Sequence, residues 1–128
     1  MTPRKRENAS ALRREAGRLL TEISAELDAL LDCQGFRKGS LYLWRHRCGR
    51  SGCHCAKGDL HEHWVLSTPH EGKLVKRYIS PEEFDRVRRQ VDAYRRFRRA
   101  LRRLRQAEGR LKEILERLAE ALDEERPP

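Results

Sequence analysis

The chain has 128 residues, of which 38% are hydrophobic and 38% are charged, and its formal net charge is +9. Such a chain buries only a modest core, and small proteins of this kind commonly need a bound metal or self-association to stay folded. No segment approaches the roughly 20 apolar residues of a membrane span and no signal peptide is visible, so we expect a cytoplasmic protein without a membrane partner. The positive charge favours nucleic acid as the partner, and an anionic membrane surface is the weaker alternative.

The first segment predicts a helix over about residues 9–34. Its apolar residues recur at spacings of three and four, namely Leu12, Ala16, Leu19, Ile23, Leu27 and Leu30. Thr2 and Ser10 are the candidate caps at its start, and Gly35 is the expected stop.

The middle segment, about residues 38–79, predicts three short strands at 41–44, 64–66 and 74–79. These runs are rich in β-branched and aromatic residues, and the turn signal at 69–72 joins the last two in a hairpin. We therefore expect a small three-stranded sheet.

The last segment predicts one long helix over about residues 81–125, because Ser80, Pro81 and Glu83 form a capping box. Its apolar stripe comprises Phe84, Val87, Val91, Tyr94, Phe97, Leu101, Leu104, Leu111, Leu115, Leu118 and Leu122. The expected fold is α+β and mainly α, in one domain. It is a long antiparallel helical hairpin with a small, zinc-clamped, three-stranded β insertion between the helices.

A cluster of metal-ligand side chains occupies residues 48–61. Cys48, Cys53, Cys55 and His61 have the spacing C-x4-C-x-C-x5-H, and thiolates with imidazole are the ligands that Zn²⁺ prefers. His63 is the alternate fourth ligand. We predict a structural zinc ion rather than an enzyme site, because four protein ligands leave no open position for water or substrate. The alternative is a set of reduced thiols that closes a loop.

These residues resemble a known family. The matching segments are Arg47-Cys48-Gly49-x3-Cys53-x-Cys55, His61, Arg77-Tyr78-Ile79-x-Pro81-Glu82-Glu83 and Tyr94-Arg95-Arg96-Phe97. They are similar to small uncharacterised bacterial proteins that carry a domain of unknown function and often occur near mobile elements. The resemblance covers about residues 38–104. It implies His61 as the fourth ligand, although Glu62-His63-Trp64 replaces the family's Gly-Pro-Tyr, and it implies no activity.

The long helix also predicts a basic surface, because Glu and Asp are absent between Ala93 and Ala107. The candidate nucleic-acid-binding residues are Arg88, Arg89, Arg95, Arg96, Arg98, Arg99, Arg102, Arg103 and Arg105, together with Arg13 and Arg14 of the first helix. We expect the basic start of the first helix, which also includes Arg4, Lys5, Arg6 and Arg18, to lie alongside residues 95–105. DNA is favoured over RNA. The alternative is a coiled-coil adaptor that recruits another protein.

The lengths of the two helices predict self-association. If the first helix covers the long helix only to about Gln106, an apolar stripe beyond it has no partner within the chain. We expect a homo-oligomer interface over residues 107–122, formed by Leu111, Ile114, Leu115, Leu118 and Leu122. A helical bundle is favoured over a basic leucine zipper, because the apolar stripe continues through the basic region.

Overall fold

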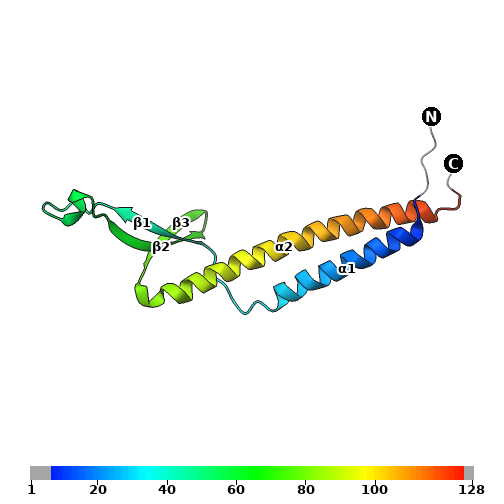
Figure 1. The fold of residues 1–128 in the computed structure, drawn as a ribbon, viewed down its shortest axis with the longest axis horizontal. Coiled ribbons are helices and arrows are strands. Elements are labelled where there is room, and N and C mark those ends of the chain that lie inside the picture. Colours follow the sequence, from blue (N-terminus) through cyan, green and yellow to red (C-terminus); the bar gives the residue numbers. More distant parts are fainter. Residues whose placement is uncertain (1–6, 126–128) are drawn as a thin grey trace, which may run out of the picture. The chain divides into compact units, whose positions relative to one another are not determined.

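The computed structural model describes residues 7–125 (Figure 1). Its elements are α1 (Ala9–Leu31), β1 (Ser40–His46), the short 3-10 helix η1 (His54–Lys57), β2 (His61–His70), β3 (Lys73–Ile79) and α2 (Pro81–Leu122). Two helices with a three-stranded antiparallel sheet between them in sequence confirm the mainly helical α+β prediction. The described residues form two compact units, one of residues 7–33 and 97–125, and the other of Gln34–Arg96.

The first helix begins at Ala9, one residue before the candidate cap Ser10. Asn8 is the cap, and its side-chain oxygen accepts hydrogen bonds from the N–H groups of Ser10 at 2.8 Å and Ala11 at 3.3 Å. Thr2 lies outside the described residues. The helix ends at Leu31, before Gly35, with Asp32 as its C-terminal cap.

The long helix begins with the predicted capping box. The N–H of Ser80 donates to Oε1 of Glu83 at 3.1 Å, and the N–H of Glu83 donates to Oγ of Ser80 at 3.4 Å. The helix ends at Leu122, three residues short of the expected end. Within residues 7–125, neither helix is long and apolar enough to cross a membrane.

In the first unit, α1 packs antiparallel against the last part of α2 (Figure 1). Leu12, Leu19 and Ile114 are its buried cluster, and partly buried apolar residues pack around them: Ala16, Leu111, Leu118 and Ala121. Ala107 is fully buried one heptad before Ile114. The seam therefore follows a spacing of three and four along both helices.

The expectation that the apolar stripe over residues 107–122 lacks a partner within the chain is wrong for its central residues. Leu111, Ile114 and Leu118 pack within the chain, and only Leu115 and Leu122 remain about half exposed. The prediction assumed that α1 covers α2 from its start. In the structure the sheet packs on the first turns of α2, so α1 pairs with the turns beyond them.

The predicted position of the N-terminal arginines is also wrong. Glu7 pairs with Arg117 at 2.7 Å and Glu22 with Arg110 at 2.9 Å, which shows the register of the hairpin. Arg13 and Arg14 therefore lie near the end of α2, not alongside residues 95–105. Arg4, Lys5 and Arg6 lie outside the described residues.

In the second unit, one face of the sheet packs on the start of α2. Leu66 and Ile79 of the sheet form a buried cluster with Val87 and Val91 of the helix. The strand order is β1-β2-β3, and both pairings are antiparallel.

The β2–β3 hairpin turns at Glu71 and Gly72, so that Pro69 lies inside β2 rather than in the turn. Pro69 faces Leu74, and β1 does not pair with β2 beyond Ser67. The residue one place before the pair that flanks a two-residue turn makes no hydrogen bond to the opposite strand. Pro69 occupies this place, so its missing N–H costs the sheet no hydrogen bond.

Candidate metal centre and nucleic-acid interface

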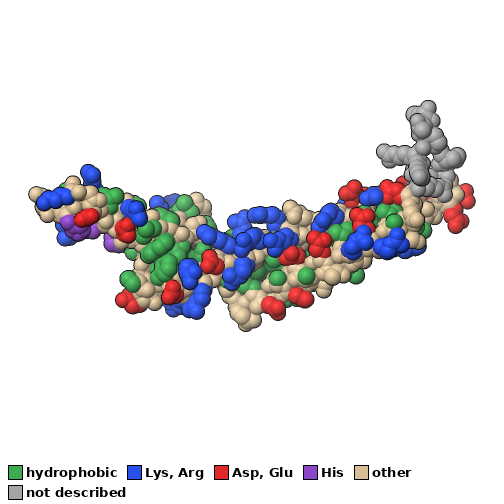
Figure 2. All heavy atoms as spheres, viewed as in Figure 1, with side chains coloured by type: hydrophobic (Ala, Val, Ile, Leu, Met, Phe, Trp, Pro, Cys, Tyr) green, Lys and Arg blue, Asp and Glu red, His purple; other side chains and the backbone are tan. Residues whose placement is uncertain are grey.

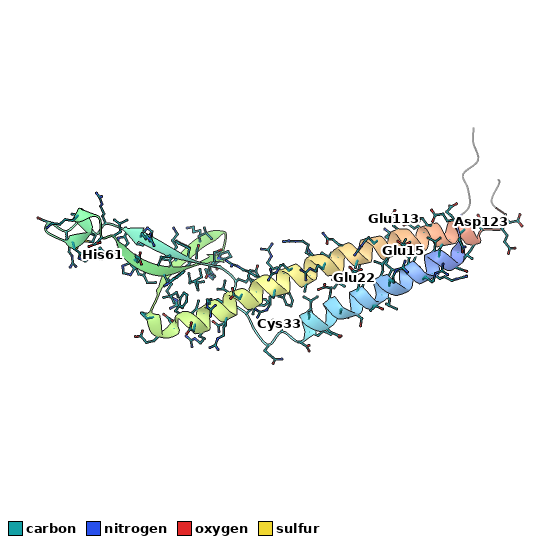
Figure 3. All side chains as sticks on the ribbon, in the orientation of Figure 1. Glu15, Glu22, Cys33, His61, Glu113 and Asp123 are labelled. Atoms are coloured by element: carbon teal, nitrogen blue, oxygen red, sulfur yellow. The ribbon has the colours of Figure 1, made fainter. Side chains whose placement is uncertain are left out.

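Three thiols and one imidazole meet at one end of the sheet. Cys48 follows β1, and Cys53 and Cys55 lie at the start of η1. His61 begins β2 (Figure 3). His46 and His61 are paired across β1 and β2, which closes the intervening segment into a loop. The four ligand atoms all lie within 4.8 Å of one another. The structure thus brings together the four predicted metal ligands, and they could bind a metal ion.

The distances between the ligand atoms fit a four-coordinate shell. Sγ of Cys48 lies 3.6 Å from Sγ of Cys55, and Sγ of Cys53 lies 3.2 Å from Nε2 of His61. In a tetrahedral site with metal–sulfur bonds of about 2.3 Å, neighbouring sulfurs lie roughly 3.8 Å apart. An ion can therefore enter the centre of the cluster with only small shifts of the side chains.

The backbone of the loop makes this convergence possible. Gly49 and Gly52 have φ angles of 77° and 79°, a region that residues with a Cβ adopt only with strain. The reversed chain points two N–H groups at sulfur: that of Cys48 donates to Cys55 at 3.5 Å, and that of Arg50 donates to Cys48 at 3.4 Å. These two hydrogen bonds orient the thiols of Cys55 and Cys48.

The protonation states of two ligands suit metal binding. The hydrogen bond from the N–H of Cys48 lowers the pKa of the Cys55 thiol, although burial opposes this change. Burial lowers the pKa of His61, with further contributions from the nearby His54 and His46. A lowered pKa keeps the imidazole of His61 neutral, which is the form that coordinates a metal.

The alternate ligand His63 has different neighbours. Its ring lies against those of His46 and Tyr78, with centroids 5.1 Å apart in each case. Two residues along β2 from His61, it belongs to a row of rings rather than to the thiol cluster. His46, which also stacks on Trp44 at 3.9 Å, has a buried Nε2 atom without a hydrogen-bond partner among the described residues.

The arginines of α2 are exposed along most of its middle. Figure 2 shows Lys and Arg side chains gathered over this part of the helix. Two of the predicted arginines form ion pairs: Nη2 of Arg88 lies 4.0 Å from Oδ1 of Asp85, and Nη1 of Arg103 lies 3.9 Å from Oε1 of Glu26. Several exposed arginines form no ion pair within residues 7–125: Arg89, Arg95, Arg96, Arg99, Arg102 and Arg105. Arg98 is exposed as well. The structure thus leaves most of the predicted arginines on α2 accessible to an anion.

One group of side chains that shares a face of the sheet was not predicted from the sequence. Tyr42, Trp44, Lys76 and Tyr78 lie on the sheet face opposite α2, where they line a pocket. The alternation of Tyr42, Trp44 and His46 was a usable signal, since residues two apart in a strand share a face. The contribution of β3 depends on the strand register, which the sequence alone does not provide.

Comparison with known proteins finds one family. A family described as a domain of unknown function, DUF6788, matches residues 10–89, which include α1, the sheet, the thiol cluster and the start of α2. No curated protein and no solved structure matches the chain.

Proposed function

Since the chain belongs to the family of this domain of unknown function, we propose its function from its own residues. The protein binds nucleic acid without catalysing a reaction, and its Cys₃His cluster holds a structural zinc ion. The observation that carries the first part is the row of exposed arginines on α2 without acidic partners among residues 7–125.

The spacing of these arginines suits a polyanion. Arg95, Arg99 and Arg102 are separated by four and three residues, so they are neighbours on one side of the helix, roughly 5–6 Å apart at their Cβ atoms. Guanidinium groups bind phosphates in a bidentate manner. An exposed basic helix suits the major groove of duplex DNA, whereas that of duplex RNA is too narrow for side chains, so we favour DNA.

Salt dependence tests this proposal. We expect the full chain to shift a DNA duplex in an electrophoretic assay at about 50 mM salt and to bind far more weakly at about 200 mM. Replacing Arg95, Arg99 and Arg102 with Gln should reduce the slope of log affinity against log salt by about three. Absence of binding even at the lower salt would refute the proposal.

The matched control is the replacement of Arg13, Arg14 and Arg18 with Gln. It removes the same charge from exposed positions of α1, which the structure places near the end of α2. A salt slope that falls equally in both triple variants would show that net charge, rather than the arginines of α2, supports binding.

The zinc proposal rests on the donor set. Three thiolates and one imidazole within 4.8 Å of one another are typical of structural zinc, and they fill all four positions of a tetrahedral shell. Reduced cysteines beside a ligating histidine suit a reducing compartment, so we propose the cytoplasm as the location. Metal analysis of protein purified without a histidine tag should give about one zinc per chain. A value near zero would exclude this role.

A second candidate role, self-association, is favoured by an exposed leucine face on the helical hairpin. One side of the hairpin carries Glu15 and Glu22 of α1 (Figure 3). Arg110 and Arg117 of α2 lie on the same side, where the ion pairs form. Five positions after each of these four residues is a leucine. Five residues turn the helix by about 140° beyond a full turn, so the leucines lie on the other side of the buried seam. The exposed leucines on this face are Leu20, Leu27, Leu115 and Leu122, with Leu31 nearby.

We propose a second copy of the chain as the partner for this face. In a two-fold pair the same leucines are buried twice, and each half-exposed leucine contributes roughly 1 kcal/mol. The five leucines of each of the two chains together contribute roughly 10 kcal/mol. This is comparable with the free-energy cost of the lost translational and rotational freedom on association. Light scattering should detect a dimer that persists when salt is raised, because salt screens the repulsion between two chains of charge +9. A strict monomer at micromolar concentration would contradict the pairing.

A further inference from the structure

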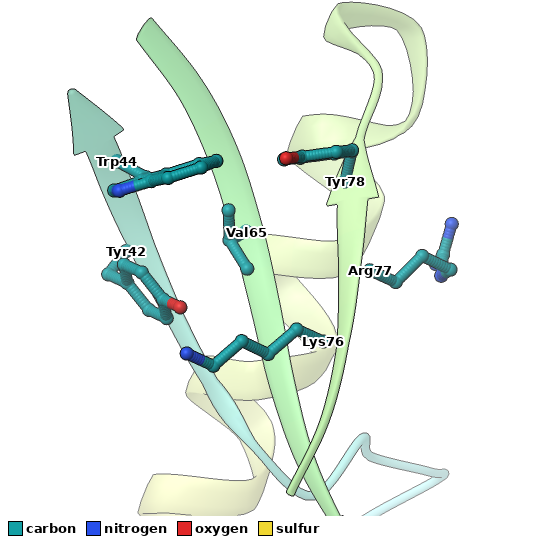
Figure 4. Close-up of a pocket in the computed structure, with 6 residues that line it drawn as sticks. All are labelled: Tyr42, Trp44, Val65, Lys76, Arg77 and Tyr78. Atoms are coloured by element: carbon teal, nitrogen blue, oxygen red, sulfur yellow. The ribbon is translucent and has the colours of Figure 1, made fainter. Parts of the chain in front are cut away.

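The sheet face opposite α2 contains a pocket of about 460 Å³ (Figure 4). Tyr42, Val65 and Tyr78 face one another across the three strands, because the register pairs Tyr42 with Val65 and Val65 with Tyr78. Val65 is buried beneath the aromatic rings and forms the floor. The pocket volume lies within the range of roughly 300–1,000 Å³ that small-molecule sites occupy.

Two aromatic rings form one wall of this pocket. The rings of Trp44 and Tyr78 are inclined by only 11°, with centroids 6.1 Å apart, and they extend toward one another across Val65 (Figure 4). Behind them, His46 stacks on Trp44 at 3.9 Å and His63 lies against Tyr78 at 5.1 Å. The histidines thus support one side of each ring and leave the other side toward the pocket.

A lysine supplies the charge. Lys76 extends from β3 across β2 toward Tyr42 (Figure 4), and it forms no ion pair with any residue in the range 7–125. Its ammonium group disfavours a cationic ligand such as a methylated lysine, although exposed aromatic rings often bind such ligands. The pocket therefore combines a flat apolar wall with a positive charge, and it fits a planar ring that carries an anionic group.

We propose that this pocket binds an unpaired nucleobase, which stacks on Trp44 and Tyr78 while Lys76 contacts the adjoining phosphate. The exposure of the two rings, 40% for Trp44 and 59% for Tyr78, leaves them available for such a contact. Stacking tolerates any base because every base has a π-face, so the site selects unpaired strands rather than a sequence. The proposal extends nucleic-acid binding to single strands and does not depend on the arginines of α2.

The test compares two labelled strands of equal length, a thymidine oligomer and an abasic sugar–phosphate strand. Both present the same backbone charge, so the difference in affinity measures the contribution of the bases. We expect the full chain to bind the thymidine oligomer about tenfold more tightly in fluorescence anisotropy. Trp44→Leu should remove this preference without changing the affinity for the abasic strand. Lys76→Gln should weaken the binding of both strands.

The matched control is Leu74→Ala, which changes an exposed residue of the same sheet outside the pocket. It should keep the preference for bases. Circular dichroism and zinc content check that each variant is folded. If Trp44→Leu does not fold, quenching of the wild-type tryptophan fluorescence by the thymidine oligomer but not by the abasic strand supports the site.

Equal affinity of the wild-type chain for the two strands would overturn the proposal, as would a Trp44→Leu variant that keeps the preference. The arginines of α2 are tested separately, because their replacement should weaken duplex and abasic binding alike. Failure of the arginine proposal therefore leaves the base preference to be judged by itself.

Discussion

The Sγ atom of Cys53 lies 3.2 Å from Nε2 of His61, eight residues further along the chain. The contact arises because β1 and β2 pair up to His46 and His61, which returns the chain to the loop that holds the cysteines. A metal bound between them would link the two strands at their open end. Such a link would stabilise the sheet, which is the structural role that we propose for the cluster.

Cys55→Ser should abolish stoichiometric zinc binding, because the thiol of Cys55 is buried and lies in contact distance of Cys48. We expect loss of the strand signal in circular dichroism while most helical signal remains. Cys33→Ser is the control, since Cys33 follows α1 and lies outside the cluster. Zinc content by mass spectrometry decides the outcome, and an unchanged content in Cys55→Ser would contradict the ligand assignment.

Ile114→Ala should lower the free energy of unfolding by about 2–5 kcal/mol, because it leaves a cavity between Leu12 and Leu19 in the seam of the hairpin. Leu115→Ala, at the next position, should change the stability of the monomer little and weaken self-association instead. Denaturant titration and light scattering separate the two effects. Equal loss of stability in both variants would mean that the seam is wrongly placed.

Glu26→Leu should stabilise the hairpin by about 1 kcal/mol. The side chain of Glu26 is only 19% exposed, lies one heptad after Leu19, and is 3.9 Å from Arg103. The partner Arg103 is 64% exposed, so removing the carboxylate leaves no buried charge behind. A well-packed apolar side chain at this largely buried position gains burial. Urea titration of the variant measures the change, and Glu22→Leu, at an exposed ion pair, serves as the comparison. A large destabilisation would show that the Glu26 pair is needed for the register.

Ser80→Ala should cost about 1 kcal/mol of stability, because it removes the acceptor for the N–H of Glu83 at the start of α2. Thermal unfolding at neutral pH measures this loss. Replacing the exposed Ser51 with Ala, in the loop before η1, should leave the start of α2 unchanged. A melting temperature unchanged by Ser80→Ala would argue against a stabilising cap.

Glu83→Gln should make the stability contributed by the cap of α2 independent of pH in the acid range. The N–H of Ser80, and then Arg77, hold the pKa of Glu83 below its ordinary value of 4.5. The stability from this carboxylate is therefore present above 4.5 and is lost as the pH falls through the lower pKa of the folded state. Gln keeps an acceptor but does not titrate. The stability gap between wild type and variant should narrow in acid, and a gap independent of pH would refute the assignment.

The start of α2 and the clustering of the three thiols with His61 could be predicted because their signals are local. Ser80 and Glu83 are three residues apart, and their hydrogen bonds form wherever that helix begins. Likewise, Cys48 and His61 are only 13 positions apart, so a short loop suffices to bring the cluster together. Asn8 was missed as the cap of α1 because Thr2 and Ser10 offered the same chemistry nearby.

The sequence by itself determined which segments are helices and strands, where the thiols and the imidazole gather, and that the middle of α2 is basic. Only the tertiary structure decided that Ile114 is buried while Leu115 is exposed, and that Trp44 meets Tyr78 across Val65. The physical reason is that periodicity and capping act within a few residues. The partner of an apolar stripe, in contrast, depends on which segments occupy each turn of α2 and on the register of the strands.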